Sequence, residues 1–180
     1  IPAVRLIEML GSSSVAGFGH TLGIESALYP NLALALGTSD VKLINLIAAY
    51  AVFPNRGKLI KPFSVMEVTD RSERVVWRVK PVKKIVMSRA SAAIMTNMLS
   101  GVIQEGTGKK ARIIKRPIAG KTGTTNEYKD AFFVGFSPSI AAGVWVGQDV
   151  FETLGKRETG AKAALPIWIE FMSKALADKP

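Results

Sequence analysis

The 180-residue sequence contains no cysteine, one histidine and no long apolar run. Without cysteine, the chain can form neither disulfides nor thiolate-held metal sites, and it remains compatible with an exported protein. His20 lies in a helix-like stretch and is interpreted as a surface residue, so a Ser-His-Asp enzyme is set aside. No window of about 18 or more uninterrupted apolar residues occurs, so no membrane-spanning helix is expected here. The first residues also lack the pattern of a signal peptide.

Acidic residues are few, because 14 Asp and Glu stand against 24 Lys and Arg, giving a net charge of +10 and a pI near 10.0. Basic clusters occur in residues 80–84, 109–116 and 156–162. Such clusters can meet nucleic acid, anionic headgroups or wall polymers. No aromatic interleaving, zinc spacing or nucleic-acid module accompanies them. They are interpreted as a solvated basic surface, and a nucleic-acid module stays an alternative that salt-dependent DNA retention would test.

Length and composition suit one folded domain, and neither an internal repeat nor a linker divides it. Ser88 is interpreted as an N-cap, and Ser39 as the cap of the clearest helix. Apolar spacing and capping signals predict helices over residues 3–10, 12–23, 40–53, 88–104 and 162–177. Residues 63–69 and 74–79 flank a polar turn and predict a β-hairpin.

Two apolar strands are predicted at residues 131–136 and 140–147, after the short turns 126–130 and 137–139. Parallel pairing needs a crossover of about a dozen residues, so these strands and the run that begins at Gly120 must form an antiparallel meander. The sequence therefore predicts an α+β fold with an antiparallel sheet flanked by helices.

The run Gly-Lys-Thr-Gly-Thr-Thr at residues 120–125 places a cation, hydroxyl groups and a side-chain-free position on the first of these strands. In an extended chain Lys121 and Gly123 share one face. Thr122 and Thr124 alternate onto the other face. Gly123 leaves room for a close approach of another backbone, and Thr124 offers an N–H and an O–H beside that gap. Such an edge can hold a carboxylate, although the tetrapeptide alone is also typical of an exposed strand without function.

The Lys-Thr-Gly motif resembles one of three motifs of the penicillin-binding proteins. The wider sequence resembles the transpeptidase domain of the class A, bifunctional type, over nearly the whole chain and in the family's order. The matching segments are Gly106-Thr107-Gly108, residues 121–126 followed by Asp130, Phe133 and Gly135, and residues 143–147. Further matches are residues 36–39 and 48–53, which resemble the helix before a small hairpin, and Thr159-Gly160 with residues 163–168, which resemble the closing helix.

The sequence departs from the family pattern in two ways. Phe132 stands where many relatives carry tryptophan, which keeps an aromatic ring. No Ser-x-x-Lys tetrad suited to the nucleophile helix occurs, because Ser39 is interpreted as an N-cap and Lys42 as a solvated lysine. The Ser-x-Asn element is also missing, and the resemblance places it just upstream of the sequence. We therefore expect residues 1–180 to be the C-terminal part of a single transpeptidase domain, with the Lys-Thr-Gly strand but without the nucleophile helix.

The resemblance also implies a role for each residue of the motif. Lys121 would supply positive charge near the donor's terminal carboxylate and the proton-transfer network. Thr122 and Thr124 would hydrogen-bond that carboxylate. The N–H of Thr124 would form one arm of the oxyanion hole. The implied substrate-binding set is Lys121, Thr122, Gly123, Thr124 and Thr125, with Lys121 and Thr124 catalytic and with no metal or cofactor.

The implied activity is that of a serine-type D,D-transpeptidase of peptidoglycan synthesis, which cross-links stem peptides through an acyl-serine intermediate and binds penicillin. The implied partners are stem peptides, β-lactam antibiotics and the N-terminal remainder of the same protein, and not nucleic acid. The implied location is the extracytoplasmic face of the bacterial cytoplasmic membrane, through an anchor outside this chain. Without the serine, this segment alone is expected to be inactive. The alternatives are a non-catalytic stem-peptide-binding or sensor domain of the same fold and, among enzymes, a carboxypeptidase or serine β-lactamase.

Overall fold

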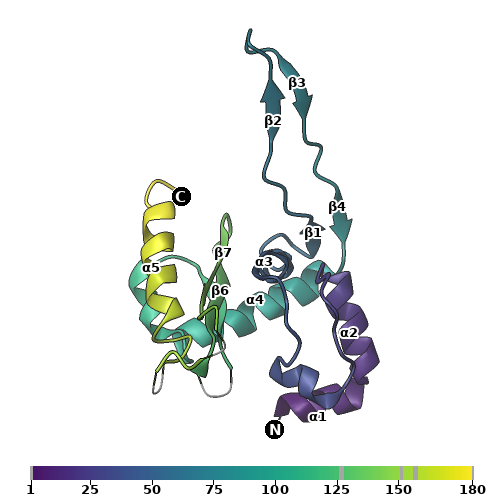
Figure 1. Cartoon of the computed structure of the whole chain (residues 1–180), viewed down its shortest axis with the longest axis vertical. Helices are drawn as coiled ribbons and strands as arrows, with labels where there is room; N and C mark the ends of the chain where they lie inside the picture. Colours follow the sequence, from purple (N-terminus) through teal and green to yellow (C-terminus); the bar gives the residue numbers. More distant parts are fainter. Residues whose placement is uncertain (1, 126–127, 151, 156–157, 180) are drawn as a thin grey trace.

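Helices surround a three-stranded sheet in the computed structural model, which describes residues 2–125, 128–150, 152–155 and 158–179 (Figure 1). The helices are α1 (Pro2–Leu10), α2 (Ser12–Thr21), α3 (Leu43–Ala51), α4 (Arg89–Gln104) and α5 (Ala164–Ala175), with short 3-10 helices η1 (Leu32–Leu36) and η2 (Lys109–Ile114). The strands are β1 (Lys58–Ile60), β2 (Glu67–Thr69), β3 (Val75–Arg78), β4 (Lys83–Ile85), β5 (Ala119–Thr124), β6 (Ala131–Phe136) and β7 (Ala141–Val146). This arrangement confirms the predicted α+β class.

Strands β5, β6 and β7 form the predicted antiparallel meander, in that spatial order. The register is uniform and places Thr122 opposite Phe133 and Gly123 opposite Phe132. Strand β6 is apolar along nearly its whole length and is buried on both faces, as expected for a central strand. Of the predicted turn at residues 126–130, residues 126–127 lie outside the described residues.

Helices cover both faces of this sheet (Figure 1). On one face, the fully buried Trp168 of α5 packs against Phe133 with ring centroids 4.8 Å apart. The Trp168 indole N–H donates to the Ala142 carbonyl at 3.0 Å, so its polar atom is satisfied in the core. On the other face, a Cβ on Gly143 would lie 2.7 Å from a side-chain carbon of Ile47, so the missing side chain lets α3 approach closely. Packing from both sides fixes β6 and, through it, the edge strand β5.

The two predicted N-caps have different outcomes. The Ser88 hydroxyl accepts the Ser91 N–H at 3.0 Å, which confirms Ser88 as the cap of α4. The prediction for Ser39 is wrong, because α3 begins only after Lys42, whose side chain makes no capping hydrogen bond. The Ser39 hydroxyl instead accepts the Tyr29 N–H at 3.3 Å. A capping side chain must stand directly before the first turn, whereas Ser39 lies three residues before Lys42, the residue at the N-cap position of α3.

Two kinds of element were not predicted. The irregular stretch before Gly37 contains η1, in which the Asn31 side chain accepts the Leu34 N–H at 3.2 Å, and the basic loop at residues 109–116 is largely η2. Strands β1 and β4 pair in a separate two-stranded ladder, with Leu59 opposite Lys84. Such three-residue strands carry too short a pattern to be recognised without their partner.

The predicted hairpin is confirmed, with shorter strands than expected. Strands β2 and β3 form a ribbon that projects far from the body above the β1–β4 ladder (Figure 1). Val68 lies opposite Trp77 in this ribbon, and both side chains are exposed. None of the helices in the described ranges is long and apolar enough to cross a bilayer.

Candidate carboxylate-binding edge

Strand β5 carries the predicted site and forms one edge of the three-stranded sheet in the described part of the chain. Its first two residues, Ala119 and Gly120, are buried, whereas Lys121 and Thr124 are exposed. The strand therefore runs from the core to the surface. Its motif lies where a ligand can reach it.

Backbone groups of β5 point alternately toward β6 and toward the open edge. The Thr125 N–H donates across to the Asp130 carbonyl at 3.0 Å. Because successive N–H groups of an antiparallel strand alternate in direction, the N–H of Thr124 points outward. The Thr122 carbonyl points outward as well, and the Lys121 Nζ donates to it at 2.8 Å. The open edge therefore presents an ammonium group and a backbone donor side by side.

The side chains of the motif alternate between the two faces, as predicted. Thr122 shares a face with Phe133, on the α5 side, whereas Gly123 shares the opposite face with Phe132. A Cβ on Gly123 would overlap the Phe132 ring. The close approach expected at Gly123 is therefore made on this face by an aromatic ring from β6, and not by a backbone.

Thr122 is held by a residue that precedes it by 15 positions. Its hydroxyl lies 2.7 Å from the Thr107 hydroxyl, just after α4. Either oxygen can donate in this pair. This contact links the Gly106-Thr107-Gly108 segment to the site, and sequence reasoning assigned no role to Thr107.

Thr124 is held from the C-terminal side. Its hydroxyl accepts the Gly160 N–H at 3.0 Å, across 36 positions of sequence, so its own hydrogen remains able to donate. Gly160 is buried, and a Cβ there would overlap the Phe132 and Gly123 carbonyls. Gly160 thus supplies the close backbone contact beside the motif. In the sequence, the only signal for this contact is that Thr159-Gly160 is one of the segments that resemble the family.

Thr125 belongs to a polar network that closes the far end of β5. Its hydroxyl accepts the Asp130 N–H at 2.8 Å. The Asp130 carboxylate in turn accepts the Trp145 indole N–H at 2.8 Å. The hydroxyl of Thr125 is thus engaged in holding the β5–β6 connection, unlike those of Thr122 and Thr124. Neither Asp130 nor Trp145 was predicted as part of the site.

A pocket of about 630 Å³ opens beside this network. Phe132 and Trp145 line it from the sheet, and Leu43 and Leu46 line it from α3. Phe132 therefore covers Gly123 and also forms a wall of the pocket. The motif edge and the pocket lie next to each other on the α3 side of the sheet.

Comparisons with known proteins agree with this geometry. Residues 23–173 match the family described as the penicillin-binding protein transpeptidase domain. The chain is 42% identical over 170 residues to penicillin-binding protein 1A of Aquifex aeolicus (strain VF5), covering 94% of this chain and 23% of that protein. It is 32% identical over 231 residues to penicillin-binding protein 1A of Pseudomonas aeruginosa, covering 99% of this chain and 28% of that protein. The chain thus spans about a quarter of the length of these curated relatives.

Solved structures match along the whole chain. The crystal structure of penicillin-binding protein 1A from Haemophilus influenzae superposes with a TM-score of 0.94 at 29% identity, covering 100% of this chain and 33% of that one. The PonA1 protein from Mycobacterium tuberculosis in complex with penicillin V gives a TM-score of 0.83 at 25% identity, covering 98% and 54%. This chain belongs to the penicillin-binding protein transpeptidase family, with relatives of the class A type.

Proposed function

We propose that the chain is the C-terminal part of a D,D-transpeptidase domain that cross-links peptidoglycan stem peptides. One observation carries the proposal. The exposed Lys121 ammonium and the outward N–H of Thr124 lie at the open edge of a strand inside the matched family region. This edge would hold the substrate's terminal carboxylate and stabilise the reacting carbonyl.

The carboxylate would be bound by Lys121, Thr122 and Thr124. A charge-assisted hydrogen bond contributes about 1.5–3 kcal/mol, so two hydroxyl donors and an ammonium suffice to orient a small anion. The bonds of Thr122 to Thr107 and of Thr124 to Gly160 hold both hydroxyl groups in place before a ligand arrives. Gly123 and Thr125 would shape the strand around these contacts.

The chemical step would use a serine from outside this chain. Its oxygen would attack the carbonyl of the penultimate D-alanine, and the C–N bond to the terminal D-alanine would break, which releases that residue and leaves an acyl-serine ester. An amine of a second stem would then attack the ester and free the serine. The N–H of Thr124 would stabilise the oxyanion in both steps, and losing one such donor typically lowers the rate about a hundredfold to a thousandfold.

Ser39 and Lys42 have the spacing of a Ser-x-x-Lys pair, but their surroundings do not support nucleophilic chemistry. The Ser39 hydroxyl accepts the Tyr29 N–H, and Lys42 is an exposed residue that precedes α3. In the described chain no hydrogen bond joins the two side chains. The nucleophile would therefore come from the N-terminal remainder of the domain.

The location follows from the substrate. Peptidoglycan cross-linking takes place at the extracytoplasmic face of the bacterial cytoplasmic membrane, so the domain would work there, through an anchor outside this chain. The same site would accept β-lactam antibiotics, and the mycobacterial relative in its penicillin V complex supports this.

The test is covalent labelling of the complete protein by a fluorescent penicillin. Lys121→Ala is expected to abolish labelling while leaving the thermal unfolding midpoint unchanged, and Lys179→Ala, at an exposed lysine distant in sequence, serves as the matched control. Thr124→Val should weaken carboxylate-bearing donors much more than analogues without a carboxylate. Unchanged labelling of Lys121→Ala, or equal losses for both kinds of donor, would contradict the assigned roles.

A non-catalytic stem-peptide-binding or sensor domain of the same fold is the second candidate. Such a domain would use the Lys121 and Thr124 edge to bind stem peptides without turning them over, and a sequence upstream of this chain that lacked Ser-x-x-Lys would favour it. Intact-mass measurement of the complete protein after penicillin treatment separates the two functions. A stoichiometric adduct supports the enzyme, whereas reversible binding of stem peptides without an adduct supports the sensor.

A further inference from the structure

Both faces of the β2–β3 ribbon are exposed in the part of the chain that the structure describes. Every residue from 61 to 69 and from 71 to 78 is exposed, which includes both strands in full. Isolated two-stranded hairpins are marginally stable at best in water, and a third strand or a packed face is needed for independent stability. The ribbon nevertheless projects from the body (Figure 1), and none of the described residues covers either of its faces.

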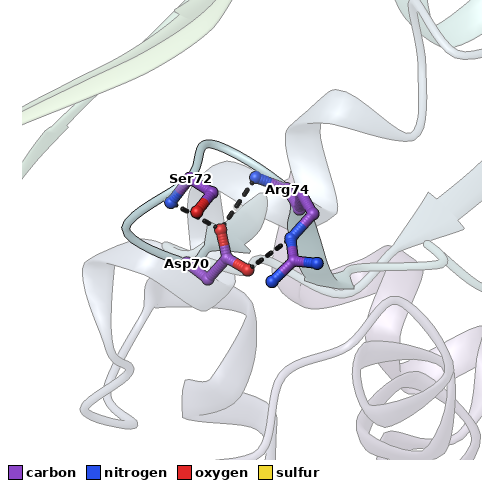
Figure 2. A network of polar contacts seen from close by, with 3 residues as sticks. All are labelled: Asp70, Ser72 and Arg74. Carbon is purple, nitrogen blue, oxygen red and sulfur yellow. Dashed lines mark hydrogen bonds and ion pairs between the residues drawn. The ribbon is translucent and has the colours of Figure 1, made fainter.

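The tip of the ribbon is polar and tightly ordered. Asp70 accepts hydrogen bonds from the Ser72 N–H at 2.8 Å, the Arg74 N–H at 3.0 Å and the Arg74 Nε at 2.8 Å, and Figure 2 shows this network closing the turn. Glu73 adopts a left-handed φ of 60° inside the turn. The tip therefore acts as a fixed polar end that holds the two strands in register.

Apolar side chains line the ribbon behind this tip. Val68 lies opposite Trp77, and the Val79 N–H donates to the Met66 carbonyl, so alternation places these four residues on one face. Met66 is 70%, Val68 46% and Trp77 48% exposed. Trp and Met are side chains that interfaces favour. This face, which we call the Trp77 face, is suited to burial against a partner.

Charge is distributed unevenly between the two arms. Residues 61–70 carry one basic and two acidic residues, whereas residues 71–85 carry six basic residues and one acidic residue. Glu67 and Asp70 neutralise Arg78 and Arg74. The remaining basic residues of the second arm make no ion pair within the described ranges, and they are Arg71, Lys80, Lys83 and Lys84. The second arm therefore carries an excess of positive charge on either side of β3, with Arg71 at the tip and Lys80, Lys83 and Lys84 beyond the strand.

We propose that the ribbon docks an acidic, strand-forming segment of a partner protein, which pairs with the open edge of β3 and covers the Trp77 face. Backbone pairing at a sheet edge supplies affinity, and alternate side chains supply specificity. Acidic residues at the two ends of that segment would meet Arg71 at the tip and Lys80, Lys83 and Lys84 beyond β3, while its apolar residues would lie on Trp77. The inference is independent of the transpeptidase chemistry, since none of these residues belongs to the β5 edge.

Two other occupants fit the ribbon poorly. A membrane surface would meet the tip first, and the tip carries Asp70 and Glu73 in a fully polar turn, whereas membrane-binding elements expose apolar side chains for insertion. A second copy of the chain would bring two positively charged second arms together, residues 71–85 of each copy.

The test measures binding of a fluorescein-labelled peptide of alternating glutamate and valine to the complete protein by fluorescence anisotropy. We expect saturable binding that weakens as salt is added. Trp77→Ser should weaken binding about tenfold or more, because buried aromatic anchors carry most of the free energy of an interface. Lys83→Glu combined with Lys84→Glu should also weaken it, and this variant keeps the test valid if Trp77→Ser unfolds.

Matched controls make the result specific. Ile113→Ser removes an exposed apolar side chain from η2, and Lys179→Glu reverses a charge near the C-terminus, so neither should change binding. Penicillin labelling should be equal in all variants. Equal binding of a lysine–valine peptide, binding unaffected by Trp77→Ser and by the double charge reversal, or binding of anionic lipid vesicles in place of the peptide would overturn the proposal. Self-association that Trp77→Ser abolishes would overturn it in favour of a second copy.

Discussion

Replacing Gly123 by alanine tests how the Lys-Thr-Gly edge is built. A Cβ at this position would overlap the ring of Phe132, its partner on β6. The overlapping atoms, Cδ2 and Cε2, form one edge of the aromatic ring, so the ring must turn or β5 must shift to make room for the Cβ. Adding one carbon to such a site typically costs about 1–3 kcal/mol, and we expect Gly123→Ala to lower the free energy of unfolding by this amount.

The same substitution should impair acylation more than stability. If β5 shifts to relieve the overlap, the outward N–H of Thr124 and the Lys121 ammonium shift with it. A displacement of about 1 Å at a reacting centre can lower a rate about a hundredfold. The assay combines urea denaturation of the complete protein with its rate of labelling by a fluorescent penicillin under conditions where the variant is folded.

Two further variants isolate the cause. Phe132→Ala removes the ring, so the double variant Gly123→Ala with Phe132→Ala should lose less stability than the sum of the single variants, with a coupling of about 0.5–3 kcal/mol. Gly101 lies in α4 with nothing near its Cβ position, so Gly101→Ala should stabilise the protein by about 0.5–1 kcal/mol. Additive losses at Gly123 and Phe132, or no loss at Gly123, would refute the reasoning.

Three other predictions follow from the fold. Trp168→Ala should lower the free energy of unfolding by about 3–5 kcal/mol in urea denaturation, because it empties a fully buried site. A loss as small as that typical of exposed residues would contradict this packing. Hydrogen bonds from Arg74 and from the Ser72 N–H lower the pKa of Asp70. The stabilisation of the hairpin tip by this carboxylate is therefore complete above the usual carboxyl pKa, and it should be lost as the pH falls through the lowered pKa. Amide exchange at Arg74 measures this loss, and an exchange rate that follows only the intrinsic pH dependence would oppose it. Trp145→Phe removes the N–H donor to Asp130 and should cost about 0.5–1.5 kcal/mol, which a thermal unfolding curve detects; an unchanged midpoint would mean that the network contributes nothing.

Local patterns predicted the elements around the site with little error. The apolar run that became β6 matches its predicted bounds, and the short connections left an antiparallel meander as the only pairing available. Alternation along β5 placed Lys121 and Gly123 on one face correctly. These features depend on neighbours within a few residues, so they can be predicted from the local sequence.

Contacts between distant segments escaped prediction. Thr107 and Gly160 reach β5 from 15 and 36 positions away, and Ser39 bonds to Tyr29 instead of capping α3. Each depends on how whole elements pack, since a hydroxyl group takes whichever partner the fold brings within reach.

The sequence by itself determined that this protein has an α+β fold, a meander that begins with a Lys-Thr-Gly strand, and membership in its family. Only the tertiary structure decided what surrounds that strand: the Phe132 ring over Gly123, the two hydroxyl groups held from opposite ends of the chain, and the exposed β2–β3 ribbon. The physical reason is that strand periodicity and turn chemistry act over a few residues. The position of a donor or the exposure of a face depends on side-chain packing between segments far apart in sequence.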